Sequence, residues 1–243
     1  MASRRNVLGG AATLGAGLLT GGGAMAANSQ GPMGGIAPAG KDLTPAQALE
    51  LLEIGNAEFL RDERSGGITS QQRRLDLASS QAPFAAYVTC SDSRVPPELL
   101  FGRGLGELFI IRNAGNTVDT VALGSIEYAV AVLNVPLVVV MGHERCGAVD
   151  AATKVVESNA TFPGSIGRMI EPIIPAVLQA RDQEGDLLDN SVRANVRRVV
   201  RQLREQTDPI MLEPQRAGKL WVVGAYYDLD EGKVDFFDLP EMA

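Results

Sequence analysis

Three side chains of this chain have the donor atoms of a metal site. The single histidine of the sequence, His143, lies three residues before Cys146, and the only other cysteine is Cys90. Two thiolates and one imidazole are a donor set that Zn²⁺ accepts in tetrahedral geometry. With no further cysteine or histidine, such a site would leave its fourth position to water, substrate or a carboxylate. The alternative is that both cysteines are small buried hydrophobic residues and that His143 is an ordinary polar residue.

Two charged residues follow the first cysteine at alternate positions. Residues 90–94 read CSDSR, and in an extended or turn segment alternate side chains share a face. Asp92 can therefore approach a metal bound by Cys90 while Arg94 keeps the carboxylate ionised. Such a carboxylate could orient a metal-bound water, or it could take the fourth metal position and close the site. The alternative is a solvated surface ion pair.

The pattern of apolar residues predicts the elements that would position these side chains. Short runs rich in Val and Ile alternate with helical patterns, which predicts an α/β fold with a mostly parallel sheet covered by helices. The expected strands are 84–89, 108–112, 137–141, 220–227 and 234–239. The expected helices are 45–62, 120–133, 147–157, 165–182 and 190–206. The first of these helices begins with the capping box TPAQ at 44–47.

Two of the expected strands end at a candidate ligand. The strand 84–89 runs directly into Cys90, and the strand 137–141 runs into Gly142 and His143. In open parallel sheets the functional crevice lies beyond the carboxyl ends of the strands. We therefore expect the two cysteines and the histidine to meet at one edge of the sheet, although they are far apart in the sequence.

The composition limits the class of the protein and its partners. The chain has 243 residues, of which 45% are hydrophobic and 21% charged, as in a globular protein with a sizeable core. Its formal net charge of −7 argues against nucleic acid as a partner, because phosphate binding needs a basic face.

The N-terminal residues have the pattern of an export signal. Residues 1–26 contain paired arginines, a weakly apolar run of glycine, alanine and leucine, and a final Ala-Met-Ala. The string SRRNVL resembles a twin-arginine signal, and the glycine content disfavours the alternative of an uncleaved membrane anchor. A cytosolic protein with a chance arginine pair is the other alternative. We expect cleavage after Ala26, a flexible linker over 27–41, and a periplasmic protein without stable membrane association.

Four motifs of the chain resemble those of the β-class carbonic anhydrases. They are CSDSRV at 90–95, GELFIIRNAGN at 106–116, IEYAV at 126–130 and GHERCGAV at 142–149. The resemblance implies a catalytic domain over 42–243, with about four parallel strands and an antiparallel edge strand flanked by helices. It also implies one Zn²⁺ per chain, bound by Cys90, His143 and Cys146, with Asp92 and Arg94 as the catalytic dyad.

The resemblance further implies the reversible hydration of CO₂ to bicarbonate and a proton by a zinc-bound hydroxide. In the plant-like branch of the family Gln, Phe and Tyr line the substrate pocket, and Gln81, Phe109 and Tyr128 stand at the matching spacings. The alternative is that Phe109 and Tyr128 are core residues and Gln81 is a loop residue. The family forms dimers or higher even oligomers, so we expect a homo-oligomer in which Gln81 acts on its partner's zinc.

Other activities and some departures from the family pattern accompany this reading. The alternatives are a carbonyl sulfide or carbon disulfide hydrolase on the same scaffold, and a non-catalytic zinc-binding protein. Ala148 stands where the family usually has a second glycine after Cys146. Tyr87 and Thr89 stand where the bicarbonate-inhibited bacterial branch has Trp and Gly, so we expect no non-catalytic bicarbonate site. Asp92 bound to zinc in a closed state would contradict that expectation.

Overall fold

The structure is a computed structural model that describes residues 42–63, 69–205 and 207–240. The expected export signal and linker, residues 1–41, lie outside the described residues. Among the residues that are described, no helix is both long and apolar enough to cross a membrane.

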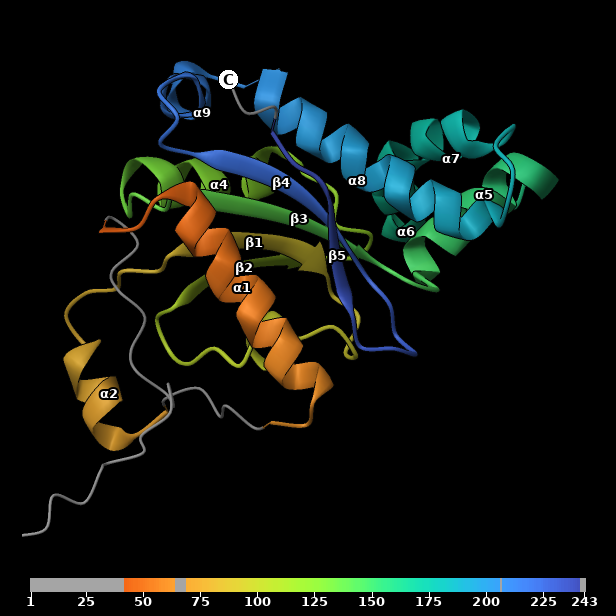
Figure 1. The fold of residues 1–243 in the computed structure, drawn as a ribbon. Helices are drawn as coiled ribbons and strands as arrows, with labels where there is room; N and C mark the ends of the chain where they lie inside the picture. The colour runs from red at the N-terminus through yellow and green to blue at the C-terminus, as the bar shows by residue number, and fades with distance from the viewer. Residues whose placement is uncertain (1–41, 64–68, 206, 241–243) are drawn as a thin grey trace, which may run out of the picture. The chain divides into compact units, whose positions relative to one another are not determined.

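A five-stranded sheet with the order β2-β1-β3-β4-β5 forms the centre of the fold (Figure 1). The strands are β1 Ala85–Cys90, β2 Leu108–Asn113, β3 Leu137–His143, β4 Trp221–Tyr227 and β5 Val234–Asp238. The first four strands pair in parallel, and β5 pairs antiparallel with β4 at the edge. The predicted fold class is therefore confirmed.

Three strands run further toward their carboxyl ends than the sequence pattern predicts. Cys90 pairs with Asn113 at the end of β1 and β2, and His143 pairs with Tyr227 at the end of β3 and β4. The ladder of the sheet continues past the last apolar residue, because backbone pairing does not depend on side-chain polarity. Two candidate ligands consequently belong to the strands themselves, where the backbone is well constrained.

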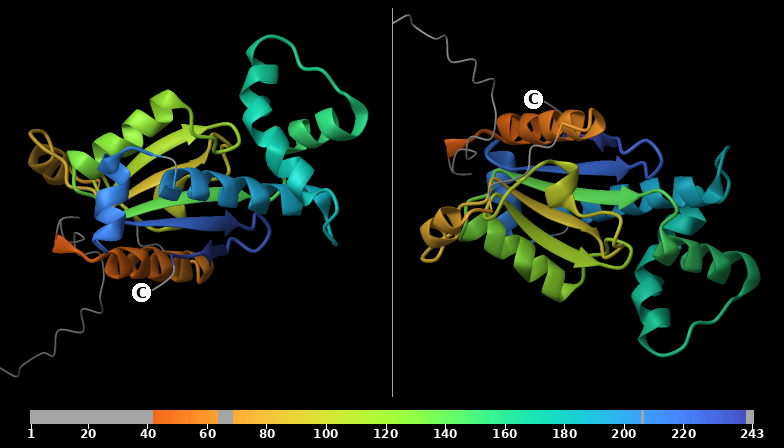
Figure 2. Two further views of the ribbon diagram at one scale, coloured as in Figure 1. Left: turned by 90° about the horizontal axis from the view of Figure 1, so that it is seen from above. Right: turned by 90° about the horizontal axis from the view of Figure 1, so that it is seen from below.

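Helices cover the sheet and extend beyond its carboxyl edge. They are α1 Pro45–Leu60, α2 Gln71–Asp76, α3 Pro97–Leu100, α4 Thr120–Ala131, α5 Gly147–Ser158, α6 Ser165–Ile170, the 3₁₀ helix η2 Glu171–Ile173, α7 Ile174–Ala180, α8 Leu187–Glu205 and α9 Pro209–Arg216. At the start of α1 the predicted capping box is present, with reciprocal bonds between Thr44 and Gln47. Figure 2 shows α1 on one face of the sheet, α4 and α8 on the other, and α5 to α7 beyond the strand ends.

The single helix predicted over 165–182 is wrong, because this segment forms α6, η2 and α7 in succession. Pro172 lies in the first turn of η2 and Pro175 in the first turn of α7. A proline has no N–H to donate and its ring crowds the preceding turn, so each one starts a new helical piece. The short helices α2, α3 and α9 were not predicted either.

The core consists of two apolar layers, one on each face of the sheet. Every residue of β1 and β3 is buried, as expected for central parallel strands. Ala48, Leu49 and Leu52 of α1 pack on one face, and residues of α4 and α8 pack on the other. A third cluster, which contains Cys90 and Cys146, lies between the strand ends and the helices α5, α7 and α8.

Gly55 allows α1 to approach the backbone at the end of α3. A Cβ atom at this position would overlap the carbonyl oxygen of Phe101, and a backbone oxygen cannot rotate away. We expect Gly55→Ala to lower the free energy of unfolding by about 2–3 kcal/mol, the usual cost of overpacking. Denaturant titration with circular dichroism measures this change.

The matched control is Gly124→Ala in α4, where an added Cβ would meet nothing within 4 Å. This glycine is exposed in a helix, so the substitution is expected to raise stability by up to about 1 kcal/mol. Equal effects of the two substitutions would show that the close approach of α1 does not limit residue 55.

Candidate metal centre

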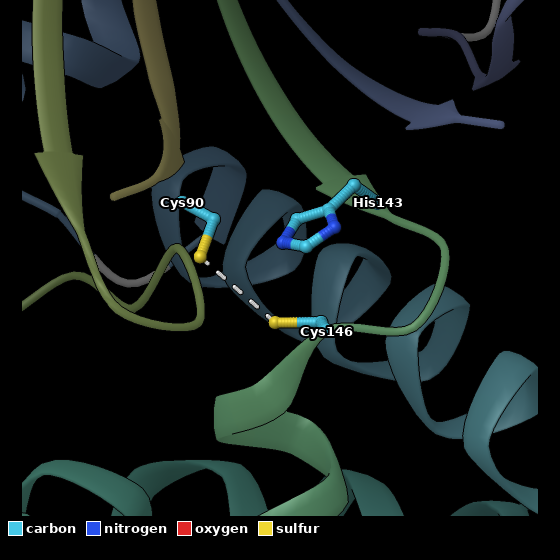
Figure 3. A group of neighbouring side chains, drawn as sticks. All are labelled: Cys90, His143 and Cys146. Carbon is cyan, nitrogen blue, oxygen red and sulfur yellow. Dashed lines mark hydrogen bonds between the residues drawn. The ribbon is translucent and has the colours of Figure 1, made fainter. Parts of the chain in front are cut away.

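Cys90, His143 and Cys146 meet where the neighbouring strands β1 and β3 end and α5 begins (Figure 3). Their candidate ligand atoms all lie within 4.8 Å of one another, and the two sulfurs are 3.9 Å apart. Figure 3 shows both sulfurs and the imidazole edge directed toward a common space. The pairing of β1 with β3 thus brings together residues that are distant in the sequence.

The buried histidine is held with one nitrogen available for a metal. Nδ1 lies 2.8 Å from the carbonyl oxygen of Glu144, which can only accept, so Nδ1 carries the proton and donates it. Nε2 is then an acceptor, and within the described part of the chain it makes no hydrogen bond although it is buried. An unpaired buried acceptor is costly, and a cation beside it removes that cost. The chemistry of the two sulfurs and Nε2 therefore fits Zn²⁺.

The surroundings of Cys90 favour its thiolate. The hydrogen bond from Cys146, aided by the Gly115 N–H at 3.4 Å, lowers the pKa of the Cys90 thiol to about 4. The same hydrogen bond to Cys90, followed by burial, raises the pKa of the Cys146 thiol. The Cys90 sulfur is therefore the better prepared of the two to bind a metal ion as a thiolate.

Asp92 and Arg94 form a bidentate ion pair beside the group of Cys90, His143 and Cys146. Oδ2 of Asp92 accepts from Nη2 of Arg94 at 2.8 Å, and Oδ1 accepts from Nε at 3.0 Å and from the Arg94 backbone N–H at 2.9 Å. These hydrogen bonds hold the pKa of the carboxyl well below its usual range, so Asp92 is ionised at neutral pH. Oδ2 lies 3.9 Å from Nε2 of His143, so the carboxylate is at the margin of the metal group.

Comparison with known proteins agrees with this arrangement. The model of the carbonic anhydrase family matches residues 85–234. "Carbonic anhydrase 2" of Mycobacterium tuberculosis is 40% identical over 190 residues, which are 78% of this chain and 91% of the relative. The chain belongs to the β-carbonic anhydrase family. A carbonic anhydrase of Mycolicibacterium smegmatis is 37% identical over 191 residues, 79% of this chain and 92% of the relative. The chain is therefore an enzyme of this family.

Solved structures of β-carbonic anhydrases have the same fold. A structure of a tetrameric β-carbonic anhydrase from Sordaria macrospora has a TM-score of 0.61 at 27% identity, covering 69% of this chain and 87% of the other. A β-carbonic anhydrase from Coccomyxa, solved in complex with acetazolamide, has a TM-score of 0.58 at 29% identity, covering 67% and 75% respectively.

Arg112 of this β-carbonic anhydrase chain supports the ligand loop, a role that the sequence analysis did not assign. Its guanidinium donates to the carbonyl oxygen of Cys90 at 2.8 Å and to that of Asp92 at 2.5 Å. Arg112 lies on the neighbouring strand β2. Its two hydrogen bonds therefore hold the backbone between Cys90 and Asp92 in place against the sheet. Its role follows from the pairing of β1 with β2, which places Arg112 opposite Thr89.

A second pair of contacts supports the loop between β3 and α5. Arg145 has a left-handed backbone with φ of 52° and pairs with Asp230 through two hydrogen bonds of 2.9 and 2.6 Å. The side chain of Glu144 accepts from the Leu229 N–H, and its own N–H donates to Tyr227. The residues between His143 and Cys146 are thereby attached to the turn that joins β4 and β5.

The expected pocket residues Gln81, Phe109 and Tyr128 lie apart from the metal group within one chain. Phe109 pairs with Ala86, four residues before Cys90, or about 13 Å along the strand. The rings of Phe109 and Tyr128 are 6.2 Å apart. Gln81 and Tyr128 both line a surface hollow of about 680 Å³. The three residues therefore gather at a place that is separate from their own chain's metal ligands.

Proposed function

We propose that the chain catalyses the reversible hydration of CO₂ to bicarbonate and a proton, with one Zn²⁺ held by Cys90, His143 and Cys146. The observation that carries this proposal is the buried Cys-His-Cys group with its unpaired Nε2 beside an ionised Asp92. When bound, zinc supplies a Lewis acid that brings the pKa of a coordinated water to about 7. The membership of the chain in the β-carbonic anhydrase family supports the same reaction.

Asp92 is the residue that would orient the attacking water. Its Oδ2 is ionised and lies at the margin of the ligand group, so it can accept a hydrogen bond from a water molecule there. Arg94 occupies both carboxylate oxygens, which opposes protonation of Asp92 and its rotation into the fourth ligand position. This arrangement supports the proposal of an open site, and the absence of a non-catalytic bicarbonate site stays a prediction.

We further propose that a second subunit completes the substrate pocket. Gln81, Phe109 and Tyr128 are remote from the metal ligands of their own chain, and the first and last of them face a solvent-exposed hollow. A homodimer, or a higher even oligomer, could bring this hollow to the partner's metal group. The related Sordaria macrospora enzyme is a tetramer, which supports an even oligomer. A protein that is monomeric by light scattering and fully active in the hydration assay would contradict this proposal.

We also propose that the protein is exported by the twin-arginine route and acts in the periplasm. The support is the sequence of residues 1–26, with paired arginines before a weakly apolar run. We expect the protein in the periplasmic fraction, with an intact mass that corresponds to a chain beginning at Ala27. A full-length protein retained in the cytosol would contradict the proposal.

The experiment that tests the activity is stopped-flow CO₂ hydration, with zinc content measured on the same samples. Preparations with graded zinc occupancy are compared from neutral to mildly alkaline pH. The hydration rate is expected to rise in proportion to bound zinc, because each loaded site acts independently of the unloaded ones. A zinc-replete protein without activity would contradict CO₂ hydration, and carbonyl sulfide and carbon disulfide would then be assayed as substrates.

A further inference from the structure

A buried asparagine of α8 lies beneath the loop that contacts Cys90. Asn195 is 1% exposed, and its neighbours Ala194 and Val196 are buried apolar residues. A polar side chain in such surroundings is costly unless it is hydrogen-bonded. The Nδ2 atom of Asn195 donates to the carbonyl oxygen of Gly115 at 2.9 Å. The asparagine thus connects α8 to the segment that follows β2.

The contacted residue touches the metal group directly. The N–H of Gly115 donates to the Sγ atom of Cys90 at 3.4 Å. Gly115 and Asn116 both have left-handed backbones, with φ of 79° and 45°, and a non-glycine residue such as Asn116 adopts this conformation at a cost. A turn of this kind persists when surrounding contacts hold it. The hydrogen bond from Asn195 to the Gly115 carbonyl is such a contact.

The packing around Gly115 leaves the turn little freedom. A Cβ atom on Gly115 would come within 2.6 Å of Ile173 and 3.1 Å of Ala148, so η2 and α5 enclose the glycine. A Cβ atom on Gly142, the residue before His143, would likewise come within 2.7 Å of Val192 and 2.8 Å of Val196 of α8. One helix therefore supports the backbone beside two of the three ligands, and Asn195 provides its polar contact.

We propose that Asn195 is a positioning residue of the metal site, whose amide fixes the Gly115 turn and keeps the Gly115 N–H on the Cys90 sulfur. This inference rests on the proposed zinc site, since Cys90 has to be a ligand. An N–H that points at a coordinating sulfur stabilises the sulfur lone pairs and orients the ligand. Removal of such outer contacts typically costs about 10- to 100-fold in metal affinity or activity.

The test compares Asn195→Leu with Asn56→Leu in the full chain loaded with Co²⁺. Leucine has the branching of asparagine, with two methyl groups in place of the amide oxygen and nitrogen, and cannot donate a hydrogen bond. Asn56 is a matched control because it is also buried and its Nδ2 atom donates to the Gly232 carbonyl oxygen at 3.0 Å. Its Nδ2 atom also donates to the Leu100 carbonyl oxygen, and its Oδ1 atom accepts from the Val234 N–H, so none of its hydrogen bonds involves the metal site. Co²⁺ affinity is measured by competition with a chromophoric chelator, and the thiolate-to-Co²⁺ charge-transfer band is recorded.

Asn195→Leu is expected to weaken Co²⁺ binding about 10-fold and to move the band to longer wavelength, because the sulfur lone pairs lose a donor. Asn56→Leu is expected to lose stability while affinity and band remain those of the wild type. Wild-type affinity and an unchanged band in Asn195→Leu would overturn the positioning role while leaving the metal site intact. A wild-type protein that binds no Co²⁺ would overturn the zinc site as well.

If Asn195→Leu does not fold, a measurement on the wild type tests the contact between the Gly115 N–H and the Cys90 sulfur, on which the proposal depends. Protein loaded with ¹¹³Cd²⁺ and labelled with ¹⁵N-glycine is examined by NMR. A scalar coupling between the Gly115 amide proton and ¹¹³Cd is expected, transmitted through the Cys90 sulfur. Absence of this coupling in a fully loaded sample would overturn the proposed N–H···S contact.

Discussion

Replacing Cys146 by serine is expected to remove zinc from the protein and to abolish hydration while the fold is retained. If the binding free energy of a zinc site, about 10–16 kcal/mol, is shared among its ligands, one lost thiolate costs about 3–4 kcal/mol, or roughly 10²- to 10³-fold in affinity. Cys146 is also the N-cap of α5, where serine is a favoured residue. Loss of zinc in this variant would therefore not result from a frayed helix.

Zinc content by atomic spectroscopy, stopped-flow hydration and circular dichroism together measure the effect. The control is Ala148→Ser, which introduces a hydroxyl into the same first turn of α5 at a buried position that is not a ligand. Ala148→Ser is expected to keep its zinc and most of its activity. A Cys146→Ser protein that keeps one zinc per chain and wild-type activity would exclude Cys146 from the ligand set.

The second large effect is expected for Asp92→Asn, which should lower kcat/KM about 10²-fold and leave zinc content unchanged. The amide can accept at only one of its two terminal atoms, so it cannot reproduce the hydrogen bonds that Arg94 donates to both Oδ1 and Oδ2. It is also neutral, so it attracts and orients a water molecule less strongly than the carboxylate. Since the pKa of Asp92 lies well below its usual range, the wild-type carboxylate is ionised across the neutral pH range, so titration of Asp92 itself does not affect the comparison there.

Asp230→Asn provides the matched control for this experiment. Asp230 is likewise an acid paired with an arginine through two hydrogen bonds, and its partner Arg145 lies between two ligands. The pair is exposed, and the contacts of Glu144 with Leu229 and Tyr227 still hold the loop, so its loss is expected to change kcat/KM by less than about 2-fold. If Asp92→Asn and Asp230→Asn reduced activity equally, the effect would reflect local charge and not a water-orienting carboxylate.

The sequence pattern predicted the central strands because each is a short continuous run of apolar residues. The run Leu137–Met141 is apolar and β-branched, and a ligand follows it directly, so both the strand and its functional end could be recognised. The broken helix over 165–182 shows the limit of periodicity. Apolar spacing continues through the segment, while Pro172 and Pro175 interrupt the hydrogen bonding that a continuous helix needs.

The supporting residues could not be predicted, because their roles depend on contacts between distant segments. Asn195 reads as one polar residue on an amphipathic helix, and only the packing of α8 against the Gly115 turn gives it a partner. The contact of Arg112 with Cys90 and Asp92 depends in the same way on the pairing of β1 with β2. In the proposed oligomer, the place of Gln81 relative to a metal ion depends on a second subunit, which one chain does not contain.

Cys90 and His143 end two adjacent strands at the centre of the sheet, and this affects when in biosynthesis an ion can be captured. Parallel neighbours require a long crossover, which here passes through α3, β2 and α4, so the two ligands meet only when β1 and β3 have paired. Before β1 and β3 pair, Cys90 and His143 are apart, and the chain has no assembled set of ligands for an ion. Unlike a zinc finger, which the metal folds, this protein is held together by the buried apolar strands. We therefore expect an ion to bind after β1 and β3 have paired, and its removal to leave the fold intact.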